Sequence, residues 1–207
     1  MVASILVGLG IVAYPAIRLV QDSRERKTDV TSLGVPAGQA SCGEVVEDKA
    51  AGNSDHLPEG TSISYPTSPP SSGSHYQTPA PFSRKFYSVE DRPALGNLVH
   101  NLEHGYTILW YDDAIAGDKA KTDAIERLAK TFDSNDQASK FIAAPYTAKD
   151  GGPTWPAGKN SAFSHWGGGE PSAQKGYRQF CGELSGEALK QFMDKYPASD
   201  SPEPNAG

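Results

Sequence analysis

Residues 97–111 read NLVHNLEHGYTILWY, in which a segment rich in histidine and glutamate runs directly into an apolar one. His100, Glu103 and His104 lie just before residues 106–111, the strongest strand candidate in the sequence. Polar side chains beside a buried element must be paired or ligated, because an unsatisfied buried polar group costs free energy. Residues four apart share a face in both a helix and a strand, so His100 and His104 converge in either conformation. Glu103 joins them only in a helix or a turn.

Hydrophobic periodicity around this stretch predicts a small mixed domain. Apolar residues recur at helical spacing over residues 117–133 and 185–196, so two helices are expected there, with a further turn or two over residues 95–102. Strand character is found in short segments at residues 43–49, 86–89, 106–111, 140–146 and 161–166. This order of elements predicts an α+β fold in which two helices pack on a small sheet.

The beginning of the sequence has the composition of a membrane anchor. Residues 2–20, VASILVGLGIVAYPAIRLV, are apolar apart from Ser4 and Arg18. Their length suffices to cross a bilayer, so residues 1–20 are predicted to be a single transmembrane helix. A cleaved signal peptide is the alternative, but the run lacks a preceding basic segment and a clear cleavage site. Residues 21–41 are predicted to be a linker.

The cysteines indicate where the folded part lies. Cys42 and Cys181 are the only cysteines, near the two ends of residues 42–196, which are predicted to form the domain. Two lone cysteines so placed suit a long-range disulfide in an oxidising compartment, and two buried free thiols are the alternative. Residues 197–207 contain three prolines and no aromatic residue, and they are predicted to be a disordered tail.

The charges beside the apolar run and the two cysteines place the domain on opposite sides of the membrane. Arg18, Arg24, Arg26 and Lys27 all follow the run or lie at its end. By the positive-inside rule this arrangement would leave the domain in the cytoplasm. We expect instead that a basic segment precedes Met1 in the natural protein, and that the domain lies on the extracytoplasmic side of the cell membrane.

A proline-rich segment lies between the anchor and the histidine-rich stretch. Residues 65–82, YPTSPPSSGSHYQTPAPF, contain five prolines, which exclude a helix and favour extended or turn conformations. His75 lies within this segment. The interleaved Tyr65, Tyr76 and Phe82 would let an ordered loop pack on a core, whereas a disordered linker would have few aromatic residues.

The succession of motifs resembles a known family. PPSSGSH at residues 69–75, HNLEHG at 100–105 and AFSHWG at 162–167 follow one another, with His56 before them. They resemble the family catalogued as domain of unknown function 3105, over roughly residues 40–196. The resemblance implies an actinobacterial protein with one N-terminal transmembrane helix and an extracytoplasmic domain. It implies no established activity.

Most of the histidines fall on positions of these motifs: His56, His75, His100 and His104. His165 departs from the family pattern and is not assigned to the site. Histidines four apart, with others supplied from proline-braced loops, suit an imidazole site for Zn²⁺ or Cu²⁺. Glu103 would be a further ligand or would orient a histidine ring. The alternative is a hydrogen-bond network in which these side chains have only a structural role.

Patterns that would indicate catalysis are weak. Residues 100–104 spell H-x-x-E-H, the pattern of one class of zinc peptidases, but that class needs a long helix through both histidines. Gly105 and the following strand would end such a helix early. The sequence contains no nucleophile elbow, phosphate-binding loop or dinucleotide fingerprint, so no enzymatic reaction is assigned.

Charge and composition restrict the partners. A formal charge of −6 argues against nucleic acid, which calls for a basic face. Met1 and Met193 are the only methionines, so a thioether copper site is not expected. Two hypotheses remain: a membrane-anchored domain that binds zinc or copper, and an accessory subunit that associates with other envelope or respiratory membrane proteins and uses its histidines structurally.

Overall fold

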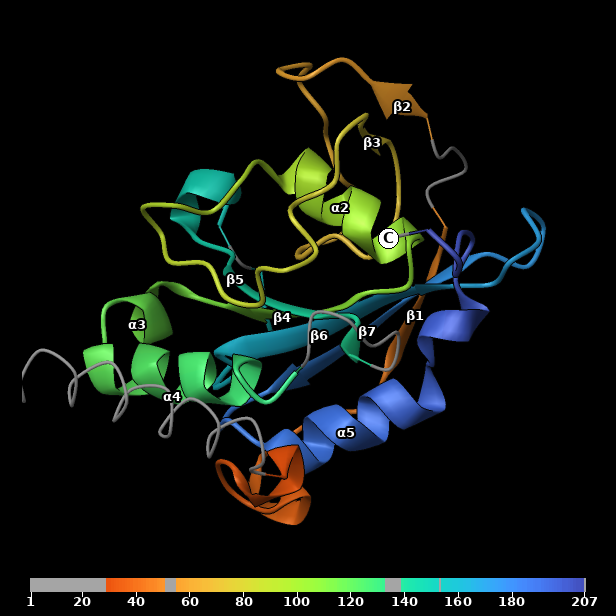
Figure 1. The fold of residues 1–207 in the computed structure, drawn as a ribbon. Helices are drawn as coiled ribbons and strands as arrows, with labels where there is room; N and C mark the ends of the chain where they lie inside the picture. Colours follow the sequence, from red (N-terminus) through yellow and green to blue (C-terminus); the bar gives the residue numbers. More distant parts are fainter. Residues whose placement is uncertain (1–28, 51–54, 133–138, 153, 207) are drawn as a thin grey trace, which may run out of the picture.

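The computed structural model describes residues 29–50, 55–132, 139–152 and 154–206. Its centre is a five-stranded sheet in the order β1-β7-β6-β4-β5. The strands are β1 (Val46–Lys49), β4 (Thr107–Tyr111), β5 (Phe141–Pro145), β6 (Ser161–Gly167) and β7 (Lys175–Cys181). Only β4 and β5 pair in parallel, and the other neighbours in this sheet are antiparallel (Figure 1). The predicted α+β class is confirmed.

Helices cover both faces of this sheet. α4 (Lys119–Ala129) and α5 (Gly186–Lys195) lie on one face, and α2 (Leu95–Glu103) lies on the other (Figure 1). Along β4, Ile108 and Trp110 pack towards α2, whereas Leu109 and Tyr111 pack towards α4 and α5. A strand buried on both faces explains why residues 106–111 are almost uniformly apolar.

The two predicted helices are confirmed with slightly shorter bounds. Asp118 caps α4 by accepting hydrogen bonds from the backbone amides of Ala120 and Lys121. Ser185 caps α5 in the same way, through the amide of Ala188. These caps satisfy amides that have no partner within the helix, which is why each helix begins where it does.

Several elements differ from the expected ones. β7 and the short helix α3 (Asp113–Ala116) were not predicted from the sequence. The segment 86–89 forms no strand, only a bridge between Phe86 and Ala143. α2 spans nine residues, longer than the expected turn or two, and it therefore carries His100 and Glu103 within one helix.

The proline-rich segment is ordered and packs on the domain. Two short strands pair in parallel here: β2 (His56–Leu57) precedes the segment, and β3 (His75–Tyr76) lies within it. The Tyr65 hydroxyl donates a hydrogen bond to the Ser74 carbonyl, and Pro69 and Pro70 are buried. The aromatic residues thus distinguish this loop from a linker, as the sequence suggests.

Both ends of the described chain pack more closely than expected. In the predicted linker, η1 (Val30–Ser32) and η2 (Ala37–Gln39) lie against α5, and the Ala37 amide donates to Glu187. In the predicted disordered tail, η5 (Ala198–Asp200) leads to Ser201, which is 1% exposed. Linker and tail compositions do not reveal these contacts, because they are made with residues far away in the sequence.

A disulfide joins Cys42 to Cys181 across a sequence separation of 139 residues. It connects the segment before β1 to the end of β7, and the alternative of free thiols is excluded. Within the described ranges, no helix is both long and apolar enough to cross a bilayer. The predicted anchor at residues 1–20 lies outside those ranges.

Candidate metal centre

Helix α2 carries the histidine-rich motif into the interior. Leu98, Val99 and Leu102 pack on the sheet, and this packing buries the polar residues of the same helix. His100 and Glu103 are 4% and 2% exposed. Residues three apart lie on neighbouring positions of a helix surface, so both side chains reach the same side of α2.

The strands β2 and β3 bring two more histidines to this helix. His56 and His75 are paired directly across the two strands. β3 approaches α2 closely because position 96 is glycine: a Cβ there would lie 2.8 Å from the Tyr76 ring. The Tyr76 carbonyl lies 2.7 Å from His100 Nδ1 and so links the strand to the helix.

Backbone carbonyls determine which nitrogen of each ring is free. His75 Nδ1 lies 2.9 Å from the Gly73 carbonyl, and His100 Nδ1 is held by the Tyr76 carbonyl. A carbonyl oxygen only accepts hydrogen bonds, so in the neutral rings both Nδ1 atoms carry the hydrogen. Each Nε2 atom therefore presents a lone pair. This is the arrangement in which histidine commonly binds metals, with its other nitrogen bonded to a carbonyl.

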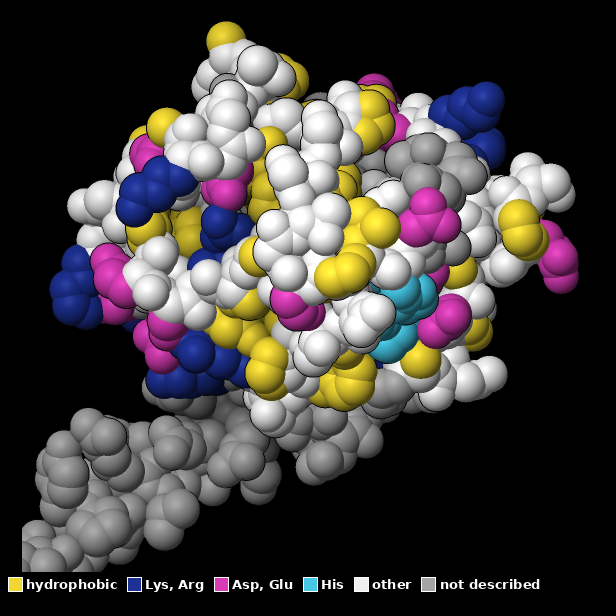
Figure 2. Space-filling model, turned by 90° about the horizontal axis from the view of Figure 1, so that it is seen from above, with side chains coloured by type: hydrophobic (Ala, Val, Ile, Leu, Met, Phe, Trp, Pro, Cys, Tyr) yellow, Lys and Arg dark blue, Asp and Glu magenta, His cyan; other side chains and the backbone are white. Residues whose placement is uncertain are grey.

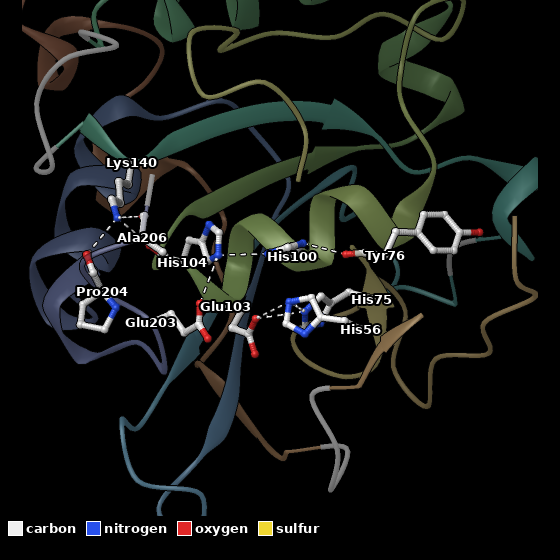
Figure 3. A network of polar contacts seen from close by, with 10 residues as sticks. All are labelled: His56, His75, Tyr76, His100, Glu103, His104, Lys140, Glu203, Pro204 and Ala206. Carbon is white, nitrogen blue, oxygen red and sulfur yellow. Dashed lines mark hydrogen bonds and ion pairs between the residues drawn. The ribbon is translucent and has the colours of Figure 1, made fainter. Parts of the chain in front are cut away.

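The free nitrogens converge with a carboxylate (Figure 3). His75 Nε2 lies 3.2 Å from His56 Nε2 and 3.0 Å from Glu103 Oε2. Ligand atoms of His56, His75, His100 and Glu103 all lie within 4.8 Å of one another. Glu103 Oε2 is buried, and its neighbours are the ring nitrogens His75 Nε2 and, 3.7 Å away, His56 Nε2. Four donor groups thus surround one point, and these groups could hold a metal ion.

The spacing is suitable for coordination. Nitrogens about 2.0 to 2.1 Å from a tetrahedral zinc ion lie about 3.3 Å from one another, close to the separation of the His56 and His75 nitrogens. Without an ion or a shared proton, lone pairs at this distance repel. The buried Glu103 carboxylate likewise requires a hydrogen-bond donor or a cation beside it.

Burial and neighbouring charges change the pKa of these groups. Burial raises the pKa of the Glu103 carboxyl, but a hydrogen bond from His75 and the nearby rings of His75, His56 and His100 lower it more, so that this pKa lies below its ordinary value. Burial lowers the pKa of His100, against the opposing effect of the Tyr76 carbonyl. At neutral pH the carboxylate is therefore ionised and His100 is neutral, the forms that bind a cation.

The matching family model covers residues 56–207 and is described as Protein of unknown function (DUF3105). This chain belongs to that family. No curated protein and no solved structure matches it. The match begins at His56 and includes the C-terminal segment. The domain expected from the sequence ended earlier, at residue 196.

His104 lies beside the four-residue group in this DUF3105 domain but is not part of it. Its Nε2 is 3.0 Å from His100 Nε2 and 3.4 Å from Glu203 Oε2. Burial and the nearby His100 lower the pKa of His104 to about 4. Of the five residues expected from the sequence to form the site, His56, His75, His100 and Glu103 thus lie in one group, and His104 lies in a neighbouring one that shares Glu103.

The sequence did not single out Glu203 or Lys140. The Lys140 ammonium donates hydrogen bonds to the carbonyls of His104, Pro204 and Ala206, and so ties the C-terminal segment to the end of α2 (Figure 3). Glu203 also donates its backbone amide to the Glu103 carbonyl. An isolated glutamate in a proline-rich tail has no local pattern that would have revealed this position.

Two other expectations about the DUF3105 domain can be compared with the structure. α2 ends at Glu103, and Gly105 follows with a φ of 88°, so no long helix carries both histidines of H-x-x-E-H. His165 lies fully buried in β6, and it belongs to neither cluster of possible ligands found among the described residues. The early end of α2 agrees with the sequence analysis.

The site opens to solvent on one side. The His56 side chain is 42% exposed, whereas those of His75 and Glu103 are 0% and 3% exposed. Histidine side chains reach the surface beside acidic ones on the face shown in Figure 2. An ion could therefore reach the buried ligands past His56.

Proposed function

We propose that this chain binds Zn²⁺ or Cu²⁺ through His56, His75, His100 and Glu103. One observation carries the proposal. His75 Nε2, which presents a lone pair in the neutral ring because Nδ1 is held by the Gly73 carbonyl, lies 3.2 Å from His56 Nε2 and 3.0 Å from Glu103 Oε2. A cation at their centre satisfies all three groups at once.

The donor set supports these two metals. Imidazole nitrogens suit zinc and copper, and a single carboxylate adds a negative charge without creating the all-oxygen site that calcium or magnesium prefers. Thiolate ligands are excluded because both cysteines are in the disulfide. Met193, a residue of α5, packs against the core on the other face of the sheet from α2, so it does not reach the four ligands.

We further propose that the domain is anchored to the membrane by residues 1–20 and lies on its extracytoplasmic side. The disulfide supports this location, since disulfides persist in oxidising compartments. The domain would then bind metal in the cell envelope without catalysing a reaction.

The second candidate function is that of an accessory subunit in an envelope or respiratory membrane complex. The 3.0 Å separation of His100 Nε2 and His104 Nε2 favours it, because His104 can donate a hydrogen bond there without any metal. In that case the histidines would link α2, β2 and β3 through hydrogen bonds alone. Metal binding distinguishes the two functions.

The test compares two buried histidines. The purified chain is treated with a chelator, desalted and titrated with Zn²⁺ and with Cu²⁺ in a calorimeter. His75→Ala removes a proposed ligand, and His165→Ala removes an equally buried histidine outside the site. We expect binding by the unmodified and His165→Ala chains and none at the four-residue site in His75→Ala.

Two results would contradict the proposal. One is the absence of binding by the unmodified chain, and the other is unchanged affinity in His75→Ala. Because both variants leave a cavity in the interior, their circular dichroism spectra and unfolding midpoints are measured in chelator. This comparison separates loss of a ligand from loss of the fold.

A further inference from the structure

A second group of possible ligands adjoins the first. Ligand atoms of Glu103, His104 and Glu203 lie within 4.8 Å of one another, and Glu103 belongs to both groups. His104 is 7% exposed, and its Nδ1 is buried without a hydrogen-bond partner in the described chain. The first position uses neither His104 nor Glu203, whose Nε2 and Oε2 atoms lie 3.4 Å apart.

We propose that the domain holds a second metal ion between His104 and Glu203, with the Glu103 carboxylate bridging the two ions. This inference rests on the proposed function, because the bridge requires an ion at the first position. Glu203, which belongs to the C-terminal segment, is then a ligand of the second ion.

The geometry suits a pair of ions. A carboxylate has two oxygens and can offer one to each ion, and metals in two-metal sites lie about 3.5 to 4 Å apart. His100 and His104 would then bind different ions, and the 3.0 Å between their Nε2 atoms places the two positions side by side. His104 Nε2 already lies 3.4 Å from Glu203 Oε2.

The backbone holds Glu203 in place for this role. Its amide donates to the Glu103 carbonyl, 3.0 Å away, so the two glutamates are adjacent although they are distant in the sequence. Lys140 fixes the following residues through the carbonyls of Pro204 and Ala206. The Glu203 side chain remains 50% exposed, which lets an ion enter from solvent.

The charges also favour a cation. Two carboxylates, Glu103 and Glu203, face the position, and the nearby positive group is the Lys140 ammonium. That ammonium is directed at three carbonyl oxygens. The net charge around the position is therefore negative before an ion binds.

The experiment counts the metals. The full chain, stripped by a chelator, is loaded with Zn²⁺ or Cu²⁺ and desalted, and its metal content is measured by mass spectrometry. Glu203→Gln keeps the shape of the side chain and removes its charge. Glu183→Gln makes the same change at an exposed glutamate outside both groups, before α5, and serves as the control.

We expect two metals per chain in the unmodified protein and in Glu183→Gln, and one in Glu203→Gln. In the copper-loaded protein, magnetic coupling through the bridge should reduce the electron paramagnetic resonance signal below that of two isolated ions, and Glu203→Gln should restore the signal of one. A single metal in the unmodified protein, or two in Glu203→Gln, would overturn the second position and leave the first intact. No bound metal at all would overturn the proposed function as well.

Discussion

The role of each buried histidine depends on what holds its two ring nitrogens. His75 and His165 are both fully buried. His75 has a carbonyl at Nδ1 and a carboxylate near Nε2, whereas neither nitrogen of His165 has a hydrogen-bond partner of good geometry in the described chain. His75 therefore has the surroundings of a possible metal ligand, whereas His165 has those of an uncharged core residue. Burial alone does not distinguish the two.

Protonation of His165 should destabilise the fold in mild acid. Burial lowers its pKa from the ordinary value of 6.5 to about 4. Between these values the unfolded chain binds the additional proton, so the free energy of unfolding falls as the pH decreases. The contribution of one such group approaches about 1.4 kcal/mol per pH unit.

Replacement by leucine tests this prediction. Urea unfolding of the unmodified chain and of His165→Leu, in chelator, is compared at several pH values from 6.5 to 4. The stability of His165→Leu should fall less steeply, because its other histidines are unchanged and only this one no longer titrates. Parallel curves would show that His165 takes up no proton on unfolding.

At the scale of elements, the site depends on the close approach of β3 to α2. Gly96 permits the Tyr76 ring to lie on the helix, and the Tyr76 carbonyl then holds His100 Nδ1. Glycine is less favourable than alanine in a helix, by about 1 kcal/mol in a helix interior, and Gly96 is the second residue of α2. This contact explains why the residue is glycine despite that cost.

Gly96→Ala should therefore destabilise the protein and weaken metal binding. The new Cβ would lie 2.8 to 3.0 Å from three atoms of the Tyr76 ring. Such overpacking costs about 1 to 3 kcal/mol. Gly38→Ala is the matched control, because a Cβ at Gly38 would meet no atom within 4 Å. Denaturant unfolding and zinc titration measure the two effects, and equal behaviour of both variants would refute the proposed steric role.

At the scale of the whole molecule, long-range connections join the ends of the domain to its centre. The disulfide joins the segment before β1 to the end of β7. The C-terminal segment reaches α2 through Lys140 and Glu203. The candidate metal centre therefore depends on contacts between parts of the chain that are far apart in sequence.

Removal of the disulfide should cost much of the stability of the domain. Closing a loop with a sequence separation of 139 residues contributes about 5 kcal/mol in the chain-entropy model. The double variant Cys42→Ser, Cys181→Ser should unfold at a correspondingly lower urea concentration than the oxidised protein. A change below about 1 kcal/mol would show that folded contacts alone hold the two segments.

The predicted anchor should keep the protein in the membrane. After a carbonate wash, the full chain should stay in the membrane fraction with its N-terminus intact, because residues 2–20 are apolar enough to remain in the bilayer. A soluble mature form that begins near residue 20 would identify the segment as a cleaved signal peptide.

The sequence by itself determined the class of fold and the two longer helices, and it indicated the one possible pairing of the cysteines and the candidate ligands among the histidines and Glu103. Periodicity and capping are local properties, and two lone cysteines allow only one intramolecular pairing. Only the tertiary structure decided that His56 joins His75, that Glu203 reaches His104, and that residues 29–41 and 198–206 pack on the domain. The physical reason is that ring tautomers and ligand distances depend on backbone carbonyls and packing from distant segments, which no local pattern encodes.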